Sequence, residues 1–180
     1  MLNILLACSR AIDGLSEWAG RIASALVLVA VLVCAGTATV RYGLNMGSNA
    51  WLEAQMVLFG AIVYFGGAQA LRLNEHIRID IIYGARSERT RLWIDIFGLV
   101  FFLMPVSLVM GWMTWDLFSA AYRSGEVSAN AGGLPMWPAK ATIPIGFALL
   151  LLQGLSELIK RIAALQGRLR LDLSYEKPQQ

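Results

Sequence analysis

The sequence predicts an all-α, polytopic membrane protein with four transmembrane helices. Its composition gives the first indication, because 57% of the 180 residues are hydrophobic and 15% are charged, whereas soluble domains carry about 45–50% apolar and roughly 25% charged residues. The second is a series of uncharged apolar runs at residues 22–40, 54–71, 96–115 and 141–156. A helix needs about 20 such residues to cross a hydrocarbon core of roughly 30 Å, so each run predicts one span.

A chain of this length leaves room for one compact bundle. We expect a four-helix membrane domain over residues 1–165, with spans near 17–42, 51–72, 92–116 and 139–162. The fourth apolar run is short, but Lys140 and Glu157 at its ends can extend their charged groups toward the lipid headgroups. Residues 166–180 form a polar segment that predicts a disordered cytoplasmic tail.

The basic residues predict the orientation. Of the 15 lysines and arginines, 12 lie before the first apolar run, between the second and third runs, or after the fourth. Cytoplasmic segments carry the excess of Lys and Arg, so both termini are expected in the cytoplasm. The tryptophans fall near predicted span ends, where aromatic rings act as membrane-interface anchors; they are Trp18, Trp51, Trp93, Trp112, Trp115 and Trp137.

The first residues of the chain admit two interpretations. Leu2, Leu5, Leu6, Ile12 and Leu15 could form one side of a short interfacial helix. The alternative is a frayed cytoplasmic end.

The segment from Arg72 to Arg91 holds five arginines and the single histidine of the chain. His76, Arg78 and Asp80 bring both signs of charge together here. A histidine beside acids can titrate near neutral pH, but catalysis or proton relay would need further polar groups through the membrane. We therefore expect a structural or docking role.

Glu53 lies at the start of the second span, where an acid is costly unless it is paired or hydrated. It is either a hydrated acid that complements the helix dipole or a specific polar contact with a neighbouring helix or a partner subunit.

Small residues predict helix packing in the second span. Gly60, Ala61, Gly67 and Ala68 give a face that lets another helix approach closely. In the third span, Pro105 is expected to kink the helix because it removes a backbone hydrogen bond.

Helical spacing also predicts local ion pairs at the cytoplasmic helix ends. Asp95 lies one turn from Arg91, and Glu157 lies one turn from both Lys160 and Arg161.

Several function classes are disfavoured. Two cysteines and one histidine fit no metal-ligand spacing, and a haem subunit would need paired histidines on facing helices. No aromatic-interleaved basic patch indicates nucleic acid. We expect no cofactor, no metal, no catalytic residue and no enzymatic activity.

A self-sufficient transporter or channel would need polar lining, and the spans offer little beyond Thr37, Thr39 and Ser107. That function, or a membrane anchor of another complex, is the alternative.

Four short motifs resemble those of a known family, in their order along the chain and in their depth in the predicted membrane domain. The resemblance covers about residues 10–165. The motifs are Trp51-x-Glu53, His76-Ile-x-Ile-Asp80, Leu134-Pro-x-Trp137 and Pro144-Ile-Gly146. Together with the four-span pattern, they resemble the small permease subunit, of DctQ type, of tripartite ATP-independent periplasmic (TRAP) transporters.

The resemblance implies a bacterial or archaeal sodium-coupled importer with three parts, placed in the inner (cytoplasmic) membrane. A periplasmic binding protein delivers a carboxylate-type solute, a large permease carries the solute and sodium sites, and the small subunit is a scaffold in membrane lipid. No inverted repeat or pair of broken helices marks a transport site in this chain. The expected partner-binding residues are Glu53, His76, Arg78, Asp80, Leu134, Pro135 and Trp137.

Overall fold

The computed structural model describes residues 2–74, 87–130 and 133–169. The helices are α1 (Leu2–Gly43), α2 (Asn49–Leu73), α4 (Glu88–Gly98), α5 (Met104–Ser124) and α6 (Trp137–Leu165), with one π-helical turn, η1 (Leu99–Leu103), between α4 and α5. Because α4, η1 and α5 run on as one rod, four helical segments within the described residues are long and apolar enough to cross a membrane. This confirms the predicted all-α fold with four spans.

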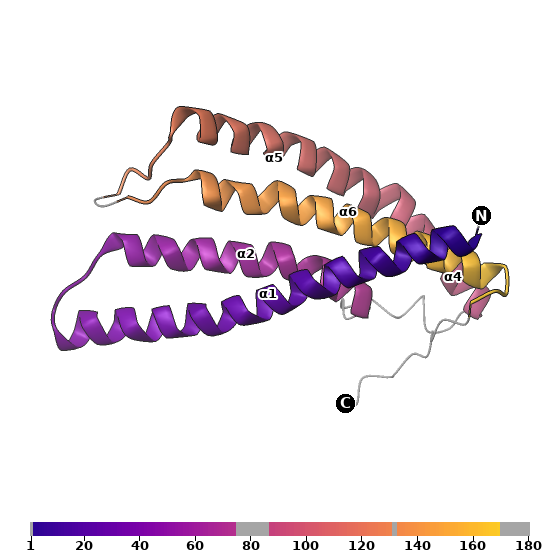
Figure 1. Cartoon of the computed structure of the whole chain (residues 1–180), viewed down its shortest axis with the longest axis horizontal. Coiled ribbons are helices and arrows are strands. Elements are labelled where there is room, and N and C mark those ends of the chain that lie inside the picture. Colours follow the sequence, from indigo (N-terminus) through magenta and orange to yellow (C-terminus); the bar gives the residue numbers. More distant parts are fainter. Residues whose placement is uncertain (1, 75–86, 131–132, 170–180) are drawn as a thin grey trace.

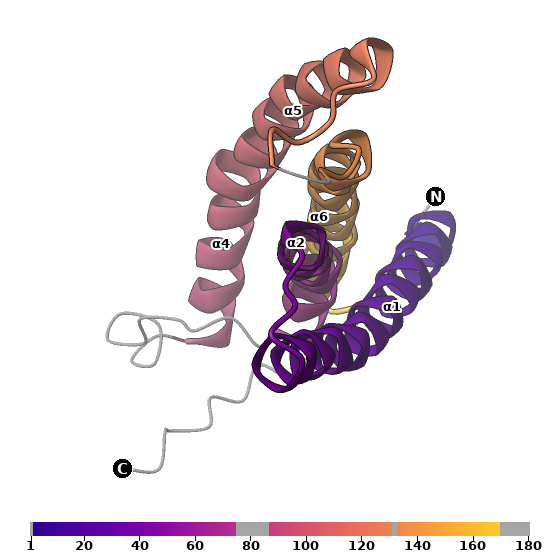
Figure 2. The same ribbon diagram turned by 90° about the vertical axis from the view of Figure 1, so that its left-hand side faces the viewer.

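The helices form two antiparallel hairpins (Figure 1). We call the end with the α1–α2 and α5–α6 connections the loop end, and the end with the start of α1 and the end of α6 the terminal end. In Figure 2, α2 and α6 lie between α1 on one side and the α4–α5 rod on the other. α6 contacts α1, α2, α4 and α5, so it is the helix on which the others are assembled.

Helix α1 is longer than the predicted span. Its 42 residues extend about 63 Å at 1.5 Å per residue, roughly twice the thickness of a hydrocarbon core. The N-terminal residues are therefore helical, but they continue α1 without a break and do not form a separate short helix. Leu5 and Leu15 are exposed on this part of α1.

A seven-residue repeat of small side chains explains how α1 packs. The repeat consists of Ser9, Ser16, Ala23, Ala30 and Thr37, of which the first four are buried and the last is half-buried. A strict spacing of seven keeps one stripe of a helix against its neighbours. Small residues in that stripe let α1 approach α6 in its first half and α2 in its second.

The central helices α2 and α6 meet through a glycine. A Cβ atom on Gly146 would lie 2.5 Å from Cβ of Tyr64, so α6 must keep glycine there. On α2, Ala61 and Ala68 are buried, whereas a Cβ on Gly60 would meet nothing within 4 Å. Within this chain the predicted packing face is therefore made by its alanines.

The α4–α5 rod accommodates Pro105 through the π-helical turn. The N–H of Met104 bonds the carbonyl of Leu99, five residues back. This wider, π-type turn comes directly before Pro105, which has no N–H to donate to the preceding turn. A Cβ on Gly154 of α6 would lie 2.7 Å from Cδ2 of Leu103. The π turn therefore packs directly on α6.

Candidate functional site

At the loop end, Glu53 binds the connection between α5 and α6. Its Oε1 accepts hydrogen bonds from the Ser128 hydroxyl and from Nδ2 of Asn130, the latter at 2.6 Å. Its Oε2 accepts from the backbone N–H of Leu134 at 3.0 Å. One carboxylate in the second turn of α2 thus fixes a loop more than 70 residues further along the chain.

The described parts of this loop form the two arms of a short hairpin, which we call the outer hairpin (residues 125–130 and 133–136). Val127 and Pro135 form an antiparallel bridge, and the N–H of Ser128 bonds the carbonyl of Leu134 at 3.0 Å. A Cβ on Gly133 would collide with the backbone carbonyl of Ser128. Glycine is therefore required where the two arms of the hairpin meet.

A salt bridge and aromatic rings join the outer hairpin to the helices. Lys140 of α6 binds Glu126 at 2.6 Å. Trp137, the first residue of α6, packs edge-on against Tyr122 of α5 with 5.7 Å between ring centroids. The hairpin is thus anchored to α2, α5 and α6 and presents a shaped surface at the loop end.

The structure brings four of the predicted partner-binding residues together at this surface. Glu53 and Leu134 bond each other, Pro135 lies in the hairpin bridge, and Trp137 begins α6. The other three, in the segment 75–86, lie outside the described residues; they are His76, Arg78 and Asp80. Of the two interpretations of Glu53, the geometry favours a specific contact, and the contact is with its own chain.

The predicted interface anchors are all exposed on the bundle. The exposed fraction ranges from 41% for Trp137 to 78% for Trp112. The others are Trp18, Trp51, Trp93 and Trp115. Such exposure is what a ring in contact with headgroups requires.

A second group of polar side chains, which we call the terminal cluster, lies at the opposite end. Its members come from α1 (Ser9, Asp13 and Ser16), α4 (Asp95) and α6 (Gln153, Ser156, Glu157, Lys160 and Arg161). With three acids and two bases, the cluster carries a formal charge of −1.

Gln153 and Asp13 connect α1 to α6. Oε1 of Gln153 accepts from the Ser16 hydroxyl at 2.7 Å, and its Nε2 donates to Oδ1 of Asp13 at 3.0 Å. The same Asp13 oxygen accepts from the Ser156 hydroxyl at 2.8 Å and lies 2.9 Å from Nζ of Lys160. Gln153 is fully buried, and its amide needs these partners because an unpaired buried polar group is costly.

Arg161 connects α6 to α4. Its Nε lies 3.0 Å from Oδ2 of Asp95, and its Nη1 binds Glu157. Glu157 also lies 2.7 Å from Nζ of Lys160. The predicted pairs of Glu157 with Lys160 and Arg161 are therefore confirmed, and Asp95 has a partner on another helix in addition to the local pairing expected from spacing.

Sequence reasoning missed the α1 half of the terminal cluster. The segment around Ser9, Asp13 and Ser16 was expected to be interfacial or frayed, because its leucines were the feature considered. The seven-residue spacing of small residues from Ser9 through Thr37 was the signal that could have indicated packing.

The polar sites at the two ends of the bundle are Glu53 with the outer hairpin and the terminal cluster, and they are alike in their hydrogen bonding and in what they join. Among the residues the structure describes, every buried side-chain nitrogen or oxygen has a hydrogen-bond partner. Both groups join helices to one another. Such groups stabilise one arrangement of the bundle.

The fold and these two sites define a multi-pass membrane protein whose polar side chains fasten its helices at both ends. A family model described as "Tripartite ATP-independent periplasmic transporters, DctQ component" matches residues 29–164, which is more than half of the chain. The protein belongs to this family and is the small membrane component of such a transporter in the bacterial inner membrane.

The matched residues include the outer hairpin and the α6 half of the terminal cluster. They begin after the first 28 residues of the chain, which contain Ser9, Asp13 and Ser16. No curated protein and no solved structure matches the chain.

Proposed function

We propose that this protein is the scaffold subunit of a sodium-coupled importer for a carboxylate-type solute. It pairs with and stabilises a large permease, and it helps to dock the periplasmic solute-binding protein that delivers the solute. Membership of the DctQ component family carries this proposal. The polar side chains of the two described sites support it, because they are engaged in joining helices of the same chain.

The terminal end lies in the cytoplasm and the loop end in the periplasm. The distribution of Lys and Arg supports this orientation, since 12 of the 15 lie before residue 22, between residues 72 and 91, or from residue 160 onward, and cytoplasmic segments carry the excess of these residues. The outer hairpin is then a periplasmic surface, with Glu53 shaping it for the binding protein or the large permease. The segment from His76 to Asp80 fixes the cytoplasmic ends of the neighbouring helices.

Cysteine labelling tests the orientation. Cys8 is exposed near the terminal end, so a membrane-impermeant maleimide should label it only after the membrane is opened. A Tyr42→Cys variant without the native Cys8 and Cys34 is the matched control, because Tyr42 is 87% exposed at the loop end. That variant should react in intact spheroplasts. The reverse pattern would invert the topology.

Deletion tests the role. A strain that lacks this chain but retains the large permease and the binding protein should lose uptake of the solute, and a plasmid copy should restore it. The level of the large permease in membranes should fall in the same strain if the small subunit stabilises it. Full uptake without this chain would contradict the proposal. Uptake by this chain alone in liposomes would favour a self-sufficient transporter.

A further inference from the structure

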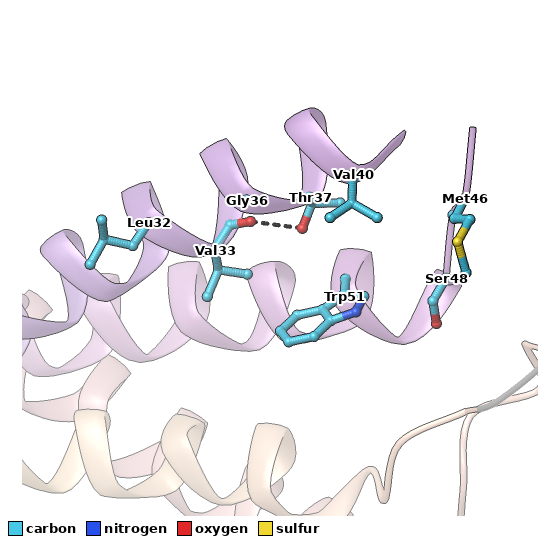
Figure 3. Close-up of a pocket in the computed structure, with 9 residues that line it drawn as sticks. Leu32, Val33, Gly36, Thr37, Val40, Met46, Ser48 and Trp51 are labelled. Carbon is cyan, nitrogen blue, oxygen red and sulfur yellow. Dashed lines mark hydrogen bonds between the residues drawn. The ribbon is translucent and has the colours of Figure 1, made fainter. Parts of the chain in front are cut away.

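A groove at the loop end has walls from α1, the α1–α2 connection and α2. It has a volume of about 520 Å³. Its lining consists of Leu32, Val33, Gly36, Thr37 and Val40 of α1, Met46, Gly47 and Ser48 of the connection, and Trp51 of α2. Figure 3 shows Trp51 reaching from α2 toward the α1 wall. The groove is separate from Glu53 and the outer hairpin.

The walls suit an apolar ligand. The hydroxyl of Thr37 already donates to the carbonyl of Val33 at 2.7 Å (Figure 3). It also accepts from Nε2 of Gln55 at 3.3 Å. A Cβ on Gly36 or Gly47 would meet nothing within 4 Å, so the two glycines leave space that a larger residue would fill. If the groove were empty, the atoms that line both of its walls would lack dispersion contacts. Hydrocarbon is therefore the favoured filling.

The depth of the groove matches one lipid leaflet. Its α1 wall extends from Leu32 to Val40, which is about 12 Å along the helix axis. One leaflet contributes about half of the roughly 30 Å hydrocarbon core. A ligand lying along this wall would run from the membrane surface nearly to the bilayer centre.

The mouth of the groove suits a phosphate. Arg41 follows Val40 in the last turn of α1, and within the part of the chain that the structure describes it forms no ion pair. Ser48, which precedes α2, makes no side-chain capping bond, so its hydroxyl is available. Ser48 lines the groove, and Arg41 is the residue after Val40, the last residue of α1 that lines it. A hydroxyl and a nearby cation at the surface end of an apolar groove are complementary to an amphipathic anion.

We infer that this groove binds a phospholipid of the loop-end leaflet, with one acyl chain along α1 and the phosphate near Arg41. A transmembrane helix of a partner is the competing occupant. With side chains, a helix is about 10–12 Å across, so it would rest across α1 and α2 and leave the space beside Gly36 unfilled. The proposal requires only that α1 and α2 cross the membrane, and it is independent of the scaffold role.

Fluorescence quenching tests the site. The full chain, with Trp51 as its sole tryptophan and the other five changed to Phe, is placed in phosphatidylethanolamine–phosphatidylglycerol nanodiscs with increasing fractions of acyl-brominated phosphatidylglycerol. A bound lipid predicts quenching that saturates at a low fraction of brominated lipid. Gly36→Leu should remove this saturating quenching, because the leucine side chain would fill the space beside the α1 wall. Ala38→Leu, at the same depth but outside the lining, should retain it. Arg41→Gln should weaken it by about fivefold.

Native mass spectrometry of the unaltered chain gives a second readout. The wild-type protein and Ala38→Leu should retain a phospholipid that Gly36→Leu loses. Quenching proportional to the brominated fraction and equal in all variants would contradict the proposal, since it would report only surrounding lipid. Loss of Trp51 quenching when the large permease is co-reconstituted would also contradict it, because a helix would then occupy the groove.

Discussion

Replacing Arg161 with Met tests the terminal cluster most severely. Arg161 is 5% exposed, and its guanidinium binds Asp95 of α4 and Glu157 of its own helix. Methionine has a similar length but cannot pair with either carboxylate. The substitution therefore leaves two buried acids without the cation that joins α4 to α6.

The magnitude follows from the contacts. Removing one member of a buried ion pair costs about 3–5 kcal/mol. Glu157 keeps Lys160 at 2.7 Å, so the lower end, about 3 kcal/mol, is expected. For a chain of this size, 1 kcal/mol shifts the Tm by roughly 2–4 °C, which predicts a decrease of about 6–12 °C.

Thermal unfolding of the purified full chain in detergent, followed by tryptophan fluorescence, measures this effect. Arg10→Met is the matched control, because Arg10 is exposed and, among the described residues, donates only to the Leu6 carbonyl of its own helix. Arg161→Lys should give an intermediate Tm, since lysine lacks the planar fork that reaches two acids. A Tm for Arg161→Met equal to that of the control would refute the assigned role of the cluster.

Two further substitutions address the helix contacts and the outer hairpin. Gly146→Leu should lower the free energy of unfolding by about 1–3 kcal/mol through overpacking against Tyr64. Gly60→Leu should leave it nearly unchanged, because a Cβ on Gly60 would meet nothing within 4 Å among the described residues. Equal Tm values would contradict the close α2–α6 contact. Glu53→Ala should speed hydrogen exchange at the Leu134 amide with little effect on the helix amides, and unchanged exchange there would show that the carboxylate does not hold the hairpin.

That the chain has four membrane-spanning helices could be predicted from the sequence. This succeeded because a membrane span is a local property, since about 20 consecutive apolar residues suffice to define it. The pairs of Glu157 with Lys160 and Arg161 were predictable for the same reason, because one helical turn fixes their separation.

Contacts between helices were not predictable, because they depend on which faces meet. The packing of Ser9 and Ser16 against α6 needs the position of a helix more than 120 residues away. The bond from Leu134 to Glu53 likewise depends on how the outer hairpin folds back. The π turn before Pro105 is local, but a proline pattern predicts only a disturbed helix and does not specify its form.

Reconstitution tests the central proposal, that this subunit braces a transporter and does not itself pass the solute. Proteoliposomes are prepared with the large permease alone, with this chain alone and with both, and solute uptake is measured under a sodium gradient in the presence of the solute-loaded binding protein. Uptake should occur only when both subunits are present. Equal uptake by the large permease alone, or any sodium-dependent uptake by this chain alone, would contradict the account.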